Sequence, residues 1–400
     1  MPRPIIALIS LMLLAVLAFS ASAAGNGDAP KAHARARDLG VPFDGTPGPL
    51  NAITDVEGVL VGHTTLIEAE GKLVVGKGPI RTGVTAVLPR GPASLQQFSF
   101  AGWYAQNGNG EMTGTTWVEE SGFLEGPVMI TNTHSVGVVR DAVVAWRVAH
   151  GAPDATGSWR SVPVVAETWD GWLNDINGFH VKPEHALQAL DSAHSGPVEE
   201  GAVGGGTGMI CNGFKGGIGT SSRRLTDKDG GYLLGVLVQC NYGTRQNLRI
   251  AGIPVGREIE SEDPYAFVPS DLAERGSIIV VVATNAPLLP HQLKRIARRV
   301  SLGIGRNGSI ASNGSGDIFI AFSTANAAAS RIGDVVDLKM LPNDSMSPLF
   351  AATVEATEEA IVNAMVAAQG MTGIDGHHVR ALPHDKLRAV LAKYHRLAPH

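Results

Sequence analysis

An apolar run over residues 277–284 constrains the fold of this chain more than any other segment. It reads Ser-Ile-Ile-Val-Val-Val-Ala-Thr, so it is rich in β-branched residues and carries no charge. Such a run is typical of a β-strand that is buried on both faces, because a strand with one face in water alternates apolar and polar residues. The chain must therefore cover both sides of the sheet that holds this strand.

The strand begins at Ser277, directly after Gly276 and a polar stretch. One interpretation is that Ser277 is an ordinary strand-entry residue. The other is that it belongs to a self-cleaving precursor, in which its hydroxyl attacks the carbonyl of Gly276 and the freed amine of Ser277 then serves as the base that activates the hydroxyl. Glycine suits that step, because it tolerates strained backbone and close approach. The local sequence alone does not decide between the two.

The remaining periodicity predicts further strands and helices. Strands are predicted over residues 52–66, 82–89, 127–133, 162–166 and 316–324, and a hairpin is predicted to join 214–224 to 232–239 through a turn at 227–231. Helices are predicted over residues 135–150, 183–193, 291–303, 352–369 and 384–394. Hairpins replace the regular strand–helix alternation that a doubly wound fold requires. The order therefore favours an α+β fold in which helices cover antiparallel or mixed sheets.

Composition argues against a nucleic-acid partner and a metal site. The net charge is −5 and no basic block occurs, so nucleic acid is not expected as a partner. No Cys-X-X-Cys pair or Cys/His metal spacing is present, and no metal site is expected. With 49 glycines among 400 residues, tight turns and close backbone contacts should be frequent.

The N-terminus has the pattern of a secretory signal peptide over residues 1–23. Residues 5–19 are apolar and Ala21-Ser22-Ala23 matches a small-residue cleavage site. The apolar run is short for a membrane-spanning helix, and nothing later in the chain replaces it. We therefore expect a periplasmic or secreted protein that leaves the membrane after signal removal. Its mature chain would start near Ala24 with a loose leader over residues 24–45.

The chain has two cysteines, Cys211 and Cys240. An oxidising compartment permits a disulfide between them. Both lie in glycine-rich or apolar strands, where cysteine is more often a small buried hydrophobe. The sequence therefore favours two free, buried thiols and leaves the bridge as the alternative.

Polar residues at strand ends are the candidates for chemistry. Ser315 and Asp317 share one strand face, because strand side chains alternate with period two; they form either an ordinary turn or a pair that orients or shuttles a proton at a nucleophile. Asn241 follows a long apolar strand and is either a turn former or a donor to an oxyanion. Glu167 also follows a strand and is either a solvated loop carboxylate or the partner of a substrate ammonium group.

Two glycine-rich segments also have two interpretations each. Residues 201–209 could cradle a phosphate, but they match neither the dinucleotide fingerprint nor the P-loop. A close approach of this backbone to a ligand or to a second strand is therefore favoured. Residues 107–111 form a turn-rich loop that is either purely structural or the wall of a pocket.

Six segments in order, residues 55–63, 107–114, 166–175, 204–222, 276–277 and 287–293, together resemble one known family. This is the L-aminopeptidase/D-esterase and β-peptidyl aminopeptidase family of self-processing serine aminopeptidases. Each segment is weak by itself. The similarity nevertheless runs from about residue 45 to about residue 380, which is nearly the whole mature chain.

The resemblance implies a role for each candidate at the cleavage site. Gly276-Ser277 would be the bond that is cut, and Ser277 would be the nucleophile. Asn241 would donate to the oxyanion, and Ser315 and Asp317 would assist at the nucleophile.

The resemblance also implies the residues that bind substrate. Glu167 would hold the substrate amine, and Trp169 would line the pocket. At least one relative carries Tyr at the position of Trp169, with its hydroxyl near the oxyanion. Trp lacks that hydroxyl, so the wall of the pocket is the role that carries over.

The fold that the resemblance implies is a four-layer αββα sandwich, which resembles N-terminal-nucleophile hydrolases in layering but differs in connectivity. Self-cleavage would give an α chain of residues 24–276 and a β chain of residues 277–400, both parts of one catalytic domain. Members commonly assemble as tetramers of such αβ units, so a homo-oligomer is expected. The implied activity is release of N-terminal residues from short peptides, amides or esters through an acyl-enzyme on Ser277, with no cofactor.

Two other functions remain open on the sequence. The nearer is an acyltransferase of the same self-processed architecture, like the ornithine acetyltransferases, although these use Thr as the nucleophile and a biosynthetic transferase needs no signal peptide. The further one is a non-enzymatic periplasmic binding protein that keeps the fold unprocessed.

Overall fold

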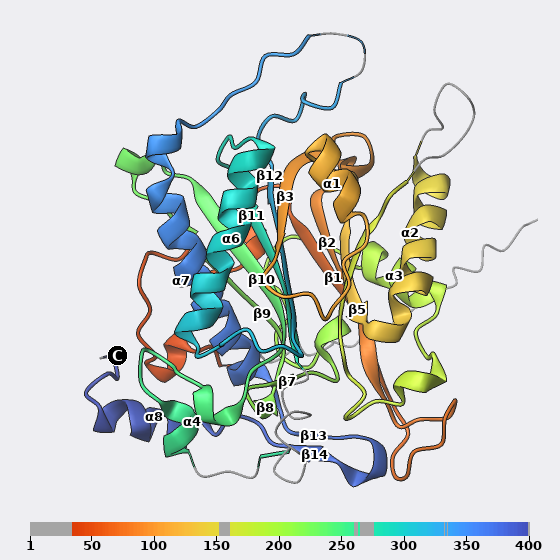
Figure 1. The fold of residues 1–400 in the computed structure, drawn as a ribbon, viewed down its shortest axis with the longest axis vertical. Helices are drawn as coiled ribbons and strands as arrows, with labels where there is room; N and C mark the ends of the chain where they lie inside the picture. The colour runs from red at the N-terminus through yellow and green to blue at the C-terminus, as the bar shows by residue number, and fades with distance from the viewer. Residues whose placement is uncertain are drawn as a thin grey trace, which may run out of the picture. The chain divides into compact units, whose positions relative to one another are not determined.

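Two mixed sheets form the centre of the computed structural model, which describes residues 34–151, 161–259, 263–264, 276–331, 333 and 335–398 (Figure 1). Within these residues the larger sheet has six strands, in the spatial order β4 (Phe123–Leu124), β3 (Ser99–Ala105), β12 (Gly316–Ser323), β11 (Ser277–Thr284), β10 (Leu233–Asn241) and β9 (Gly217–Arg224). The smaller has four, in the order β1 (Leu60–Glu68), β2 (Ile80–Pro92), β5 (Val128–Asn132) and β6 (Val164–Thr168). The pairs β11–β12 and β5–β6 are parallel and the other neighbours are antiparallel.

Helices cover the outer face of each sheet (Figure 1). The six-stranded sheet carries α6 (Pro290–Arg306) and α7 (Ser347–Ala367), and the four-stranded sheet carries α2 (Val136–His150) and α3 (Pro183–Asp191). Buried hydrophobic side chains fill the space between the two sheets and the space between each sheet and its helices. The expected four-layer αββα sandwich is confirmed.

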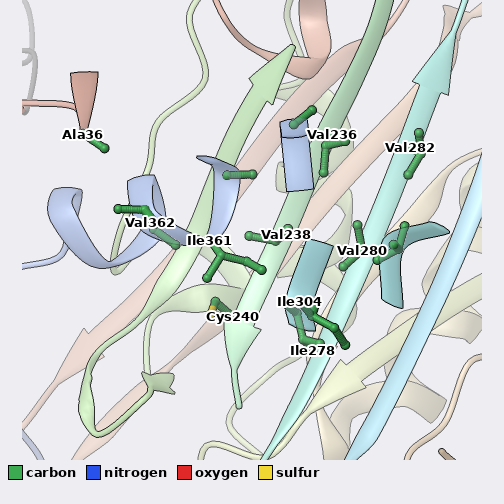
Figure 2. Packing of buried hydrophobic residues seen from close by; sticks show 14 of the residues in the cluster. Ala36, Val236, Val238, Cys240, Ile278, Val280, Val282, Ile304, Ile361 and Val362 are labelled. Carbon is green, nitrogen blue, oxygen red and sulfur yellow. The ribbon is translucent and has the colours of Figure 1, made fainter. Parts of the chain in front are cut away.

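The central strand β11 is buried on both faces, as its composition predicts. Val280 and Val282 belong to the core that α6 and α7 cover (Figure 2). Ile279 and Val281 belong to the core between the two sheets. All eight residues of Ser277–Thr284 are buried. The chain therefore meets the requirement that both sides of this strand be covered.

Some elements differ from the prediction for identifiable reasons. The strand expected over residues 52–66 begins only at Leu60, because Ile53–Asp55 forms a 3-10 turn. Strand β3 was not predicted, since glycine in the middle of a strand lowers strand propensity. A Cβ at Gly102 of β3 would lie 2.3 Å from the backbone nitrogen of Lys294, so glycine is needed where α6 crosses this strand.

Three shorter α-helices and two short hairpins complete the described α-helices and strands. The helices are α1 (Thr115–Ser121) and α4 (Val255–Glu258), neither of which was predicted, and α8 (His384–Lys393), which was. The hairpins are β7 (Ile210–Cys211) with β8 (Phe214–Lys215), and β13 (Met371–Thr372) with β14 (His378–Val379).

The prediction of a loose leader over residues 24–45 is wrong for the described part, which begins at residue 34. Ala36 and Leu39 are buried in the core beneath α7. Arg37 forms an ion pair with the buried Glu359 of α7, with 2.8 Å between Nε and Oε1. Because Glu359 lies far along the chain, the polar sequence of the leader gave no sign of this partner.

The predicted signal peptide, residues 1–23, lies outside the described residues, as do residues 265–275 before the candidate cleavage site. Of the helices that are described, none combines the length and the apolar composition needed to cross a membrane. In the same part of the chain, no group of three or more His, Cys, Asp or Glu side chains is arranged to hold a metal ion.

The glycine-rich residues 201–209 pack backbone against backbone. A Cβ at Gly206 would lie 2.5 Å from the backbone nitrogen of Ile218, and one at Gly205 would lie 2.7 Å from the carbonyl oxygen of Ile130. Such distances leave no room for a side chain. The prediction of a close approach to a second strand is confirmed.

Cys211 and Cys240 form a disulfide, so the prediction of two free thiols is wrong. The bridge joins the β7–β8 hairpin to β10, and the backbone brings the two Cα atoms to 5.5 Å, well within the range for a disulfide. That distance is a product of the tertiary structure, because the cysteines are 29 residues apart in sequence.

Replacing both cysteines by alanine is expected to lower the free energy of unfolding by about 2–4 kcal/mol, because the bridge closes a long loop in the unfolded chain. Urea denaturation of the wild type and the double variant, each with and without reductant, checks this. Reductant should lower the midpoint of the wild type alone. Equal midpoints for the two oxidised proteins would contradict the bridge as a stabilising element.

Candidate active site

Three adjacent strands bring Asn241, Ser277 and Gly316 side by side. Asn241 is the last residue of β10 and pairs with Ser277, the first residue of β11. Ser277 in turn pairs with Gly316, the first residue of β12. Paired residues of neighbouring strands direct their side chains to the same face of the sheet. Asn241 and Ser277 therefore both face the four-stranded sheet.

The hydroxyl of Ser277 lies beside the carbonyl of the preceding residue. The backbone N–H of Gly316 donates to Ser277 Oγ at 3.2 Å and to the carbonyl oxygen of Gly276 at 3.3 Å. One donor thus contacts both oxygens. A Cβ at position 276 would lie 2.5 Å from the carbonyl oxygen of Asn241, so this position requires glycine.

The side-chain amide of Asn241 is held at both of its ends. Its Nδ2 donates to the carbonyl oxygen of Trp169 at 2.9 Å, and its Oδ1 accepts from the backbone N–H of Ile210 at 2.8 Å. An amide nitrogen has two N–H donors. One N–H of Asn241 is therefore not used by these two hydrogen bonds.

Ser315 and Asp317 contact each other on the opposite face of the sheet. Ser315 Oγ donates to Asp317 Oδ1 at 2.6 Å. The ladder partner of Asp317 is Ile278, which packs under α6 and α7, so the carboxylate points away from the Ser277 side chain. Burial raises the pKa of Asp317, and its hydrogen bonds oppose that rise. In the described part of the chain, no hydrogen bond joins the Ser315 or Asp317 side chain to Ser277 Oγ. Gly316, which lies between Ser315 and Asp317 in sequence, is the residue that contacts Ser277.

The loop at residues 107–111 connects the two carboxylates of the site. Asn107 Oδ1 accepts from the backbone N–H of Asp317 at 2.6 Å. At the other end of the loop, the backbone N–H of Glu111 donates to Glu167 Oε1 at 2.9 Å. The sequence left this loop undecided between structure and pocket wall, and the structure shows that it is both, because Asn109 lines the pocket described below.

Glu167 lies inside β6 of the four-stranded sheet and is buried. Its carboxylate accepts a hydrogen bond from the Thr133 hydroxyl as well as the one from the Glu111 N–H. Sequence analysis did not identify Thr133. Burial raises the pKa of Glu167, and these hydrogen bonds oppose the rise. A carboxylate can accept about four hydrogen bonds. Glu167 therefore keeps acceptor capacity for a ligand.

A pocket of about 380 Å³ brings Ser277 and Glu167 together, whereas Asn241, Ser315 and Asp317 are not among its lining residues. Its lining residues are Asn109, Thr133, Glu167, Trp169, Gly276, Ser277 and Gly314. The indole of Trp169 lies close to Gly171, where a Cβ would come within 2.6 Å of the ring. The pocket thus brings together a hydroxyl, a buried carboxylate and an aromatic wall, contributed by both sheets.

The comparison with known families decides the identity. The model of peptidase family S58 matches residues 51–379, which is most of the chain. The chain belongs to peptidase family S58. Members of this family are peptidases and therefore hydrolases. Relatives that are named aminopeptidases support the aminopeptidase activity expected from the sequence.

The S58 relatives match over nearly their whole lengths. The beta-peptidyl aminopeptidase BapA of Sphingosinicella microcystinivorans is 58% identical over 379 residues, covering 91% of this chain and 93% of the relative. The protein of the same name from Sphingosinicella xenopeptidilytica is 48% identical over 396 residues, covering 96% of each. The similarity therefore extends over the whole sandwich and not over a single motif.

Solved S58 structures agree with the fold. The L-aminopeptidase D-Ala-esterase/amidase of Ochrobactrum anthropi superposes with a TM-score of 0.84 at 50% identity, covering 91% of this chain and 99% of that one. It is described as a prototype for the serine aminopeptidases and a variant among the Ntn hydrolase fold. A beta-aminopeptidase from Burkholderia sp. gives a TM-score of 0.80 at 48% identity, covering 90% and 99%. These matches favour a serine aminopeptidase over the acyltransferase and the binding protein.

Proposed function

We propose that this S58 aminopeptidase is made as a precursor that cuts itself between Gly276 and Ser277. The observation that carries the proposal is the Gly316 N–H that contacts both Ser277 Oγ and the Gly276 carbonyl oxygen. That arrangement holds the hydroxyl beside the carbonyl it attacks and offers a donor to the oxyanion that forms.

Self-cleavage proceeds in two steps, an acyl transfer and a hydrolysis. Ser277 Oγ bonds to the carbonyl carbon of Gly276 while the peptide C–N bond breaks, and the hydroxyl proton passes to the nitrogen. Water then hydrolyses the resulting ester, which leaves a carboxylate on Gly276 and a free amine on Ser277. With the signal removed, the products are an α chain of residues 24–276 and a β chain of residues 277–400.

The same serine serves turnover. The α-amine of Ser277 takes the hydroxyl proton, Oγ attacks the scissile carbonyl of the substrate, and Asn241 with nearby backbone N–H groups stabilises the oxyanion. The leaving amine takes the proton, and water hydrolyses the acyl-enzyme. Ser315 and Asp317 assist from the other face of the sheet, by holding the start of β12 and so the Gly316 N–H against Ser277.

The pocket selects substrates with a free N-terminal amine. Glu167 is a buried carboxylate that is not neutralised by a lysine or arginine among the described residues, and it faces the same pocket as Ser277. An ammonium group is its natural partner. We propose release of the N-terminal residue from short peptides, amides or esters. The names of the BapA relatives extend that proposal to β-amino acid residues.

Electrophoresis under denaturing conditions, followed by intact-mass measurement, tests the precursor proposal. Two polypeptides that begin near Ala24 and at Ser277 are expected. A single intact chain with full aminopeptidase activity would contradict self-cleavage as the source of the catalytic amine.

The Glu167→Gln variant should narrow the preference for free amines. The wild type is expected to hydrolyse an aminoacyl anilide much faster than its N-acetylated analogue, as kcat/KM. Gln keeps the size of the side chain but removes the charge, so the ratio should fall by about 10-fold or more, as expected for a lost charge-assisted hydrogen bond.

The matched control for Glu167→Gln is Glu111→Gln. Glu111 contacts Glu167 through its backbone N–H, so this change removes a neighbouring charge and leaves that hydrogen bond in place. It should retain the preference for the free amine. If the wild type hydrolyses both substrates equally, Glu167 does not bind an ammonium group.

We further propose that the protein is exported and forms a homo-oligomer. The signal-peptide pattern and the Cys211–Cys240 disulfide both support an oxidising compartment such as the periplasm. Exposed apolar side chains on the β1–β2 connection, among them Val74 and Val75, offer a surface for assembly. Size-exclusion chromatography with light scattering measures the oligomeric state.

A further inference from the structure

Lys215 in β8 is fully buried, and within the described residues it forms no ion pair. Its Nζ donates to the carbonyl oxygens of Met209 at 2.8 Å and Gly216 at 2.9 Å. Burial lowers the pKa of Lys215 to about 7. A neutral amine has two N–H donors, which matches the two carbonyls. Burying a lysine without an ion-pair partner costs free energy. The function of the carbonyls that Lys215 binds can therefore explain why a lysine is present at this position.

The Met209 carbonyl belongs to the same peptide group as the N–H of Ile210. That N–H donates to Oδ1 of Asn241 at 2.8 Å. A peptide group is planar and stiff, so the direction of its carbonyl sets the direction of its N–H. Lys215 and the backbone N–H of Gly216, which donates to the same carbonyl at 3.0 Å, therefore hold one side of a rigid group whose other side holds Asn241.

The hairpin that carries this peptide is anchored to β10 on both sides of Asn241. Cys211 is bridged to Cys240, and the backbone N–H of Asn212 donates to the carbonyl oxygen of Tyr242 at 2.7 Å. These two anchors set the position of the hairpin, but they do not involve the Asn241 side chain.

The Ile210 N–H and the Trp169 carbonyl together fix how the Asn241 amide is oriented. A donor at Ile210 requires the amide oxygen on that side, which places Nδ2 on the other side, where it donates to the Trp169 carbonyl. If the 209–210 peptide turned, the amide would lose the bond that holds its oxygen end, and of these two bonds only the one from Nδ2 to the Trp169 carbonyl would remain. The amide could then rotate about that single bond, so the direction of the free N–H of Nδ2 would be less tightly fixed.

We propose that Lys215 is a positioning residue for the oxyanion site, acting through the 209–210 peptide to orient the amide of Asn241 toward the oxyanion at Ser277. This inference rests on the proposed role of Asn241 as the oxyanion donor. Both bonds of Lys215 Nζ go to backbone carbonyls outside the pocket lining, so its effect on the reaction passes through the 209–210 peptide and Asn241. The hydrogen bond to Oδ1 also polarises the amide and strengthens its N–H groups as donors.

A double-mutant cycle tests the inference. Lys215→Met removes both donors and keeps the length of the apolar stem, and it is measured alone and together with Asn241→Ala. Turnover of an aminoacyl anilide is normalised to the self-cleaved fraction. Lys215→Met is expected to lower kcat by about 10-fold with KM changed by less than about threefold. In the Asn241→Ala background it should lower kcat by less than about threefold, because no amide remains to be positioned.

Two further variants separate positioning from loss of structure. Lys215→Gln keeps N–H donors on a shorter side chain and should recover part of kcat. The Cys211→Ala/Cys240→Ala protein loosens the same hairpin but retains the Lys215–Met209 and Ile210–Asn241 bonds. It should keep kcat within about threefold of the wild type, even though it is less stable.

Four results would overturn the inference. They are an unchanged kcat in Lys215→Met, an equal loss in both backgrounds, an equal loss in the disulfide-free protein, and an unchanged kcat in Asn241→Ala. The last of these would contradict the proposed oxyanion role itself and is thereby distinguished from the other three. If Lys215→Met does not fold, the cycle is run with Lys215→Gln, whose smaller loss should again disappear in the Asn241→Ala background.

Discussion

The Ser277→Ala variant is expected to purify as one uncleaved polypeptide without aminopeptidase activity. Alanine lacks the oxygen that attacks the Gly276 carbonyl, so the chain is not cut and the catalytic amine is not released. The Cβ methyl group of alanine occupies the same space as the Cβ of serine, so the sandwich should fold normally. Denaturing electrophoresis, intact-mass measurement and turnover of an aminoacyl anilide provide the three readouts.

Ser277→Cys is the matched control, because it keeps a nucleophile of similar shape at the same position. It should still cut itself, at a changed rate, and give the two chains. Efficient cutting of Ser277→Ala at the same bond would mean that another protease processes the chain. The mechanism proposed for Gly276-Ser277 would then be wrong.

The Asn241→Ala variant is expected to fold and to lose about 10²–10³-fold in kcat, which is the usual effect of removing one oxyanion donor. The effect on KM should be much smaller, since the donor acts mainly on the charge that develops in the transition state. Steady-state kinetics on the self-cleaved fraction, with the melting temperature as a check on folding, measures both.

Asn109→Ala provides a comparison at the wall of the pocket. Asn109 lines the pocket and donates to the Gly314 carbonyl, and among the described residues no hydrogen bond joins its side chain to Asn241 or Ser277. A change here should act on KM more than on kcat. If Asn241→Ala retained the kcat of the wild type, Asn241 would have no part in the oxyanion site.

The elements of the sandwich were predictable where a local pattern carries them. Strand β11 and helix α6 have strong periodicity or composition of their own, and their bounds differ little from the prediction. Strand β3 was missed because its glycine serves α6, a partner more than a hundred residues later in the chain. Propensity describes a segment by itself and is overridden by such packing.

The candidate residues were predictable as types, but their arrangement was not. Ser277, Asn241 and Glu167 were singled out because each ends or begins an apolar strand, and the resemblance supplied their roles. The period-two pattern placed Ser315 and Asp317 on one strand face, and the resemblance gave them an assisting role at the nucleophile, without saying which face of the sheet they share. The ladder pairs Asp317 with Ile278 and turns the carboxylate away from the Ser277 side chain.

The sequence by itself determined the two-sided burial of β11, the layered α+β class and the Gly-Ser pair at the start of the central strand, because these follow from composition and short-range periodicity. Only the tertiary structure decided the Cys211–Cys240 bridge, the docking of the leader on α7 and the chain of contacts from Lys215 to Asn241. Each of these depends on which strands become neighbours, and that is set by the simultaneous packing of both sheets and their helices. No local segment contains that information.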